Sequence, residues 1–376
     1  MKRYILGVAL LVLPVAAQEK QSFVINVGTP EGQLLQTIGQ DTDDAHKAAL
    51  AQDFLSKYPK HEAAGWVCAQ LESALVSQKE YDKALEAGEA TYANVPDMDL
   101  AYYATKAAVA KGDVDQVKKW SARTSENARK ITGSGKAPAN DEDKQNLEYA
   151  KQVDEYSEYA LYVTALKEKD NPKTVIDLVE TIEKQNLKSR YLPLASRPYF
   201  AALEKAGEGG KVCSAADRMS GGGSKNAEAM LVAADCAWRG QRAASVVSYG
   251  SKALESINSR QKEEGMSDSD WANMKEGIQG TAECYVGVGY SLEQKWGPAN
   301  KSLRAALPML KGNEELRGTA LFYLGLANYS LGKTIGDKSQ MRQGMQFFQQ
   351  SAAITNPMQD QASKNAKLVL QELGGK

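Results

Sequence analysis

Patterns of residues typical of a catalytic or metal-binding site are scarce in this sequence of 376 residues. Only two histidines are present, His46 and His61, and neither belongs to a set of metal ligands. The HExxH pattern of zinc proteases and the GxSxG pattern of serine hydrolases are absent. We therefore interpret each histidine as a solvent-exposed helix residue, and we expect no metal site and no catalytic residue.

Two glycine-containing runs invite comparison with phosphate-binding loops. Gly332-Lys333-Thr334 matches the end of a P-loop, but Ala327 stands where the loop requires its first glycine. Gly287-Val288-Gly289 lacks a third glycine, and both runs lie in segments with helical periodicity. We therefore expect no cofactor. An enzyme whose acid and base residues form no motif is the least favoured of three functional hypotheses.

Four cysteines, Cys68, Cys213, Cys236 and Cys284, could form disulfides. No CxxC pattern occurs, which argues against a zinc ribbon and against a thioredoxin-type redox pair. Cys213 and Cys236 each lie in a short predicted helix, and only a glycine-rich turn separates these helices. We predict a disulfide between them; the alternative is that both are small buried residues.

The elements that would position these residues are short amphipathic helices. From about residue 43 onward, apolar residues recur at spacings of three and four, and proline lies mostly between the helical segments. In the stretch 63–91, for example, two helical faces are separated by a break at residues 78–80. Two helices of this length joined by a tight turn form a helical hairpin.

The hairpins repeat along the chain. Gly287 and Gly325 open two similar units and lie 38 residues apart, close to a period of about 34 residues in which each repeat is a helix pair. Small residues such as Gly325 allow the two helices of a pair to approach closely. We predict about eight hairpins in one continuous array over residues 43–376, because repeat units pack only on their neighbours.

These residues resemble the tetratricopeptide repeat (TPR) family, most clearly over about 65–130 and 280–357. Glu72 and Asn328 depart from the family pattern, which favours a small residue and a tyrosine at these positions. The resemblance implies an all-α, right-handed superhelical solenoid of antiparallel helix pairs. The runs 29–35 and 54–59 are similar to exported bacterial TPR-like proteins.

The resemblance also implies that a ligand-facing groove lies on the first helices of the hairpins. Aromatic and apolar residues predicted there are Tyr102, Phe322, Leu326 and Tyr329, which we take as candidate partner-binding residues. Tyr149, Tyr156, Tyr159 and Tyr162 recur along one side of a long predicted helix. For all these aromatic residues two interpretations stay open: contact with a partner, or packing between repeats.

The N-terminus has the layout of a secretory signal peptide. Lys2 and Arg3 precede an apolar run over residues 4–17, which is too short to span a bilayer. We expect cleavage after Ala17; the alternative is an uncleaved anchor. Residues 18–42 are predicted to be extended or irregular, with a helix start near Thr29-Pro30, and residues 132–143 are predicted to form a mobile loop.

The charge and hydropathy of the sequence argue against two classes of partner, nucleic acids and membranes. The formal net charge is -1, and the sequence contains no basic patch. Both observations argue against nucleic-acid binding. The mean hydropathy is -0.47, and no second apolar stretch reaches membrane-spanning length. We expect an exported protein, periplasmic or secreted, with no stable membrane insertion after cleavage.

The leading functional hypothesis is a non-enzymatic scaffold that binds a segment of another protein on the concave face of the solenoid, in envelope assembly or secretion. The alternative is a periplasmic helical-repeat protein that binds a small molecule or a glycan.

Overall fold

All regular structure in the described part of the chain is helical. The computed structural model describes residues 23–133, 137–221, 223–262 and 265–374, where it contains seventeen α-helices, two short 3₁₀ helices and no strand. The predicted all-α fold class is therefore confirmed. The chain divides into two compact units, unit 1 over residues 1–191 and unit 2 over residues 192–376.

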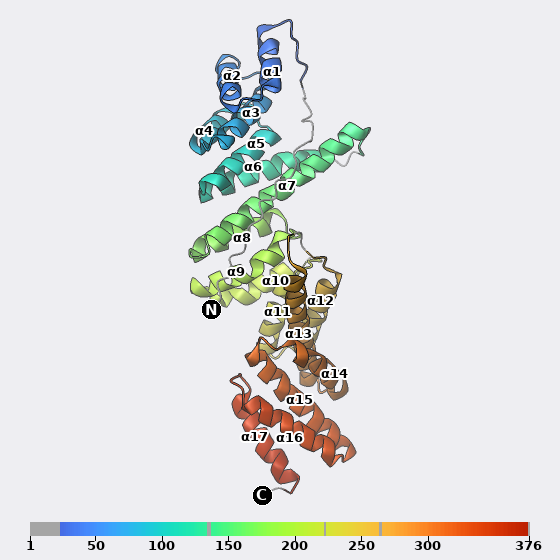
Figure 1. Cartoon of the computed structure of the whole chain (residues 1–376). Coiled ribbons are helices and arrows are strands. Elements are labelled where there is room, and N and C mark those ends of the chain that lie inside the picture. The colour runs from blue at the N-terminus through green and yellow to red at the C-terminus, as the bar shows by residue number, and fades with distance from the viewer. Residues whose placement is uncertain (1–22, 134–136, 222, 263–264, 375–376) are drawn as a thin grey trace. The chain divides into compact units, whose positions relative to one another are not determined.

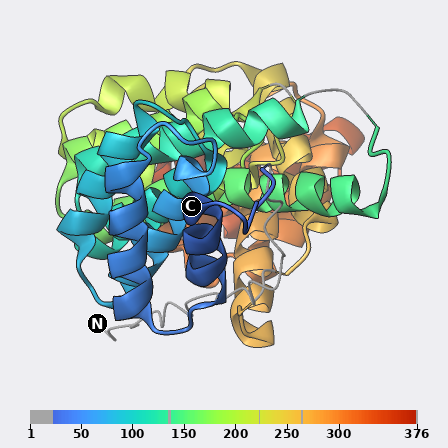
Figure 2. The ribbon, with the colours of Figure 1, turned by 90° about the horizontal axis from the view of Figure 1, so that it is seen from above.

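Unit 1 contains four helical hairpins, and Figure 1 labels their helices. The helices are α1 (Pro30–Gln40), α2 (Asp44–Lys57), α3 (Ala64–Ser77), α4 (Tyr81–Tyr92), α5 (Met98–Lys111), α6 (Val114–Thr132), α7 (Asp141–Lys167) and α8 (Pro172–Gln185). Figure 2 shows α1 and α2, in dark blue, side by side. The first helices of successive hairpins, α3, α5 and α7, also contact one another, and we call them the first-helix layer of unit 1.

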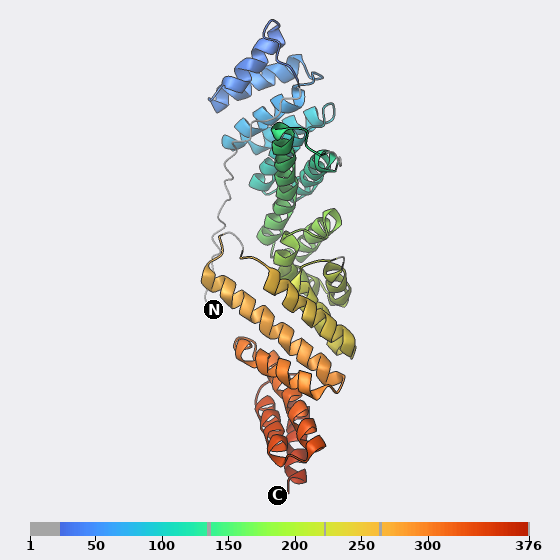
Figure 3. The same ribbon diagram turned by 90° about the vertical axis from the view of Figure 1, so that its right-hand side faces the viewer.

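Unit 2 continues the same pattern. Its α-helices are α9 (Tyr191–Lys205), which starts at the last residue of unit 1, then α10 (Val212–Ser220), α11 (Ala227–Arg239), α12 (Ala243–Ser259), α13 (Asp268–Leu292), α14 (Trp296–Ala306), α15 (Glu314–Ile335), α16 (Lys338–Ala352) and α17 (Gln359–Glu372). The 3₁₀ helices are η1 (Gly209–Lys211) and η2 (Leu307–Met309). Figure 3 shows α13 lying beside α12, and the first helices α11, α13 and α15 contact one another in turn.

Close approach of paired helices depends on small residues, as the sequence predicts. At Gly325 of α15, an added Cβ would lie 2.7 Å from Cδ1 of Phe348 on α16. At Gly287 of α13, it would lie 2.5 Å from Cγ of Leu303 on α14. Any larger residue at these glycines would push the paired helices apart, because helix interfaces are close-packed.

The helix ends follow local sequence signals. The predicted break at residues 78–80 lies between α3 and α4, where Lys79 adopts a φ of 63°. Thr29 caps α1 by accepting the backbone N–H of Gly32 at 3.2 Å, and Pro30 occupies the first turn. The expectation of an irregular segment over residues 18–42 is thus corrected, since α1 fills Pro30–Gln40.

Several predicted features lie wholly or partly outside the described residues. The signal peptide predicted over residues 1–17 lies entirely outside the described residues. The loop predicted over 132–143 lies partly outside them, at residues 134–136. The end of α6 at Thr132 and the start of α7 at Asp141 place the connection between these two helices. Within the described ranges, no helix is both long and apolar enough to cross a membrane.

Candidate binding surfaces

The predicted partner-binding residues fall in both units. Phe322, Leu326 and Tyr329 lie on α15 of unit 2, and Tyr102 lies on α5 of unit 1. Phe322 is only 3% exposed and packs against the rings of Tyr323 and Phe348, at centroid distances of 5.2 and 5.7 Å. The structure therefore corrects the assignment of Phe322 to a ligand-facing surface, because its side chain fills the core between α15 and α16.

Leu326 and Tyr329 are half-buried, and the last helix of the chain contacts their neighbourhood. The Tyr329 hydroxyl donates to Oε2 of Glu372 on α17 at 2.5 Å and accepts from Nζ of Lys333 at 2.9 Å. Lys333 and Glu372 form an ion pair at 3.1 Å. This end of α15 is therefore already engaged by α17, which leaves Tyr329 less available to a partner than the sequence suggests.

Tyr102, by contrast, belongs to a row of aromatic rings on α5 and α7 that the first residue of α9 extends, and we call this row the tyrosine strip. Its members come from α5, α7 and the first residue of α9: Tyr102, Tyr103, Tyr149, Tyr156, Tyr159, Tyr162 and Tyr191. All are half-buried except Tyr102, which is 8% exposed. The rings of the strip pack between helices, and six of the seven side chains stay partly exposed, so contact with a partner stays a prediction.

The rings of the strip form a continuous chain of contacts. Tyr102 and Tyr156 meet edge to face with their ring centroids 4.9 Å apart. Tyr156 lies 5.8 Å from Tyr159, and Tyr159 lies 5.8 Å from Tyr191. These separations are those of favourable aromatic pairs, so each ring is held by its neighbours. The strip is therefore a rigid surface that loses little conformational entropy on binding.

A single lysine lies over one end of the strip. Nζ of Lys106 is 4.4 Å from the ring centroid of Tyr102 and 5.0 Å from that of Tyr103, within the range of cation–π contacts. Burial lowers the pKa of Lys106, and burial raises the pKa of Tyr102 to about 12. Nearby, the Tyr149 hydroxyl donates to Oδ1 of Asp99 at 2.7 Å.

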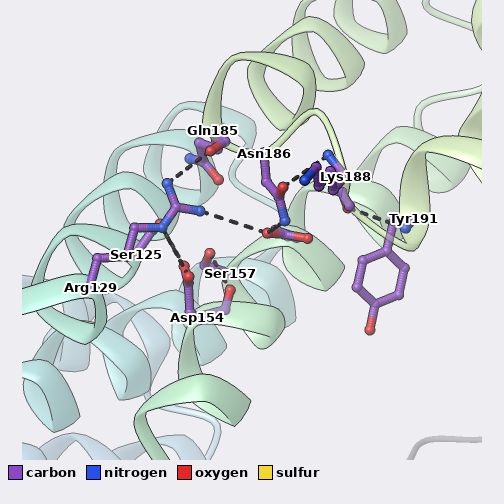
Figure 4. Close-up of polar contacts among 10 residues, drawn as sticks. Ser125, Arg129, Asp154, Ser157, Gln185, Asn186, Lys188 and Tyr191 are labelled. Atoms are coloured by element: carbon purple, nitrogen blue, oxygen red, sulfur yellow. Dashed lines mark hydrogen bonds and ion pairs between the residues drawn. The ribbon is translucent and has the colours of Figure 1, made fainter. Parts of the chain in front are cut away.

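A polar network fixes the helices behind the strip (Figure 4). Arg129 of α6 donates from Nε to Oδ2 of Asp154 on α7 at 2.9 Å, and from Nη1 to the carbonyl of Gln185 at the end of α8 at 2.8 Å. Ser125 donates to the other oxygen of Asp154 at 2.6 Å. In the close-up the Tyr191 ring points away from this network. Arg129 thus joins three helices, which sets the position of α7 and of the tyrosines it carries.

Unit 2 contains a pocket of about 510 Å³, a volume typical of ligand sites. Its walls come from α9, the η1–α10 segment, α11, α13, the start of α15 and Pro357. Cys213 and Cys236 are disulfide-bonded at this wall, with their sulfur atoms 2.03 Å apart and their Cα atoms 5.7 Å apart. The disulfide predicted from sequence is therefore present in the structure, where it joins α10 to α11.

Polar and aromatic side chains meet in the pocket wall. Tyr285 of α13 donates to Oδ1 of Asp235 on α11 at 3.0 Å, and Arg239 forms an ion pair with the other Asp235 oxygen. Trp238 donates from its indole nitrogen to the Tyr323 hydroxyl at 2.9 Å. The wall is therefore held by side-chain contacts between α11, α13 and α15.

The two histidines occupy different environments. His46 lies exposed on α2 beside Asp41, as predicted. His61 lies instead in the turn between α2 and α3, half-buried against the Phe54 ring, and its Nδ1 accepts the backbone N–H of Ala63 at 3.0 Å. The prediction of an exposed helix position is thus wrong for His61. Among the described residues, no group of three or more metal-ligating side chains converges.

Comparison with known proteins gives little to transfer. No protein-family model matches the chain, and no curated protein sequence matches it. Among solved structures, the crystal structure of the P58(IPK) TPR domain at 2.5 Å matches over 92% of this chain and 98% of that chain, at 12% sequence identity and a TM-score of 0.25. Because both values are low, no feature of that domain is transferred to this chain.

The pocket is the feature that sequence reasoning missed. Its walls come from helices far apart in the sequence, and no local motif marks them. The tyrosine spacing on α7 was visible in the sequence, but the contributions of Tyr103 and Tyr191 were not. Only the packing of α5 against α7 and the position of Tyr191 bring these rings into one strip.

Proposed function

We propose that this chain is a non-enzymatic scaffold that binds a segment of another polypeptide on the tyrosine strip of unit 1. The observation that carries the proposal is the strip itself: six of its seven tyrosines are linked ring to ring, and Tyr149 packs on the same apolar cluster as Tyr102 and Tyr156. Tyrosine is enriched at the centres of protein interfaces because it offers a large, rigid and amphipathic contact area.

The neighbouring polar groups suit a peptide better than a purely apolar ligand. The hydroxyl oxygens of the strip can accept hydrogen bonds from backbone N–H groups, which peptide segments present. Lys106 has no carboxylate within ion-pair distance among the described residues, so it can meet an anionic group of the partner. Export to the periplasm or medium, and a role in envelope assembly or secretion, remain part of this proposal and rest on the N-terminal sequence alone.

A site-specific photocrosslinking experiment tests the proposal. The photoreactive residue p-benzoylphenylalanine replaces Tyr103 or Tyr159 in the full chain, in the cells that make it. The matched control replaces Tyr81, a half-buried tyrosine of α4, outside the first-helix layer. We expect the same partner polypeptide to crosslink at both strip positions and not at Tyr81. Equal crosslinking at all three positions, or no crosslinking at the two strip positions, would contradict the proposal.

A glycan or small molecule on the same strip is the second candidate, because tyrosine rings also stack on the apolar faces of sugars. A ligand that binds only the folded state raises the unfolding temperature by mass action. Stabilisation of the purified chain by soluble oligosaccharides, lost in a Tyr159→Ala variant, would favour this candidate. Crosslinking of a polypeptide without such stabilisation favours the scaffold.

A further inference from the structure

We propose that the pocket of unit 2 binds a cationic group, an alkylammonium or a guanidinium, carried either by a peptide side chain or by a free amine. The pocket is separate from the tyrosine strip, since all its lining residues lie within residues 200–357 of unit 2. The inference therefore goes beyond the proposed function of unit 1, and its test does not depend on the outcome for the tyrosine strip.

The shape of the pocket comes from several elements converging on one hollow. Phe200 of α9, Trp238 of α11 and Tyr285 of α13 line it together. The centroids of the Trp238 and Tyr285 rings are 6.5 Å apart. Aromatic rings of this kind attract cations through the negative charge of their faces, and tryptophan does so most strongly. The lining thus combines apolar contact area with groups that favour positive charge.

The charges of the lining are predominantly negative. Glu204, Asp235 and Glu315 line the pocket, and Arg239 is the single basic residue in its wall. Arg239 is already paired with Asp235. The carboxyl groups of Glu204 and Glu315 are on exposed residues, and neither has a hydrogen-bond or ion-pair partner within the described ranges. The pocket therefore retains two uncompensated negative charges.

The position of Glu204 is not explained by helix stability. It lies in the last turn of α9, where the partial negative charge of the helix end disfavours a carboxylate. Glu315, in the first turn of α15, is favoured by its own helix. A cation bound between the two would offset the repulsion at Glu204, and it would also compensate the charge of Glu315.

The pocket wall is held in place before any ligand arrives. The disulfide between Cys213 and Cys236 ties α10 to α11 at the wall, and Asn226 donates to Oγ of Ser196 at 2.8 Å, which ties the start of α11 to α9. Tyr285 and Arg239 together occupy both oxygens of Asp235, which fixes that carboxylate. A preorganised wall of this kind loses little entropy on binding.

Calorimetric titration of the full chain tests the proposal with three probes. The first is the capped tripeptide acetyl-Gly-Arg-Gly-amide, the second is the same peptide with neutral citrulline in place of arginine, and the third is spermidine. We expect the arginine peptide or spermidine to bind about tenfold more tightly than the citrulline peptide, and more weakly as salt rises. Binding of the arginine peptide indicates that a peptide side chain carries the cationic group, and binding of spermidine indicates a free amine.

The variant Glu204→Gln/Glu315→Gln should weaken cation binding by about tenfold, because it removes both free carboxylates. Glu314→Gln is the matched control: it lies in the same turn of α15, does not line the pocket, and pairs with Arg317. It should leave cation binding unchanged. No binding of either cation, equal binding of the citrulline peptide, or equal weakening by Glu314→Gln would overturn the proposal.

Discussion

The carboxyl group of Glu72 on α3 lies directly against Gly88 on α4, so that a Cβ added to Gly88 would come within 2.2 Å of Oε1 of Glu72. Glu72 is 0% exposed, and neither of its carboxylate oxygens has a hydrogen-bond partner within the described ranges. The same hypothetical Cβ lies 3.5 Å from Cη2 of Trp120 on α6. Gly88 therefore makes room for a buried acidic side chain in the core of unit 1.

We expect Gly88→Ala to destabilise the chain by about 1–3 kcal/mol, because the added methyl group overpacks the site beside Glu72. The matched control is Gly277→Ala on α13, where nothing lies within 4 Å of the new Cβ. That control should gain up to about 1 kcal/mol, since alanine has the higher helix propensity. Urea unfolding followed by circular dichroism measures both. A neutral Gly88→Ala would show that α3 and α4 have room to separate.

Glu72 should also make stability depend on pH. Burial, and secondly the negative charge of Asp97, raise the pKa of Glu72 well above its ordinary value of 4.5. Above pH 4.5 the folded state therefore binds more protons than the unfolded state, and the free energy of unfolding falls as pH rises. Glu72→Gln keeps the shape and removes this titration.

Melting temperatures of wild type and Glu72→Gln, measured from pH 4.5 to 8, check this expectation. The stability of the variant relative to wild type should increase steadily with pH. Asp97, whose pKa is raised by burial as well, contributes a slope of the same sign to both proteins and cancels in the comparison. Parallel curves across the range would mean that Glu72 ionises freely in the folded state.

Removing Arg129 should loosen the helices that carry the tyrosine strip. Arg129→Met removes the donor to Oδ2 of Asp154 and to the Gln185 carbonyl, although Ser125 still donates to Oδ1 of Asp154, and we expect a loss of about 2 kcal/mol. Burial raises the pKa of Glu158, and attraction to Arg129 partly opposes that rise. The variant should therefore lose more stability at pH 8 than at pH 5. Chemical unfolding at the two pH values measures it, and a loss independent of pH would exclude the contribution of Glu158.

Phe322→Ala should destabilise the chain by about 3–5 kcal/mol, because the phenyl ring is almost fully buried between α15 and α16. Tyr329→Phe removes only a half-exposed hydroxyl and should cost no more than about 1 kcal/mol. Thermal unfolding of both variants measures the difference. Similar melting temperatures for the two would mean that Phe322 lies at the surface after all.

Local sequence signals predicted the helices and their ends. The α3–α4 break at residues 78–80, the cap at Thr29 and the close approach at Gly325 each depend on residues a few positions apart, or on one glycine facing its partner helix. The pairing of Cys213 with Cys236 was also predictable, because only a short turn separates their helices.

Burial and the assembly of sites depended on tertiary packing. Helical periodicity shows which face of α15 is apolar, but it does not show whether Phe322 or Leu326 meets the next helix. Periodicity likewise gave no reason for the complete burial of Glu72, which depends on the space that Gly88 leaves on another helix. Glu204 of α9 and Glu315 of α15 line one pocket only because the intervening helices pack so that both side chains reach the same hollow. Sequence spacing fixes contacts within one helix or hairpin, whereas contacts between hairpins are set by how side chains from separate helices fill a shared volume.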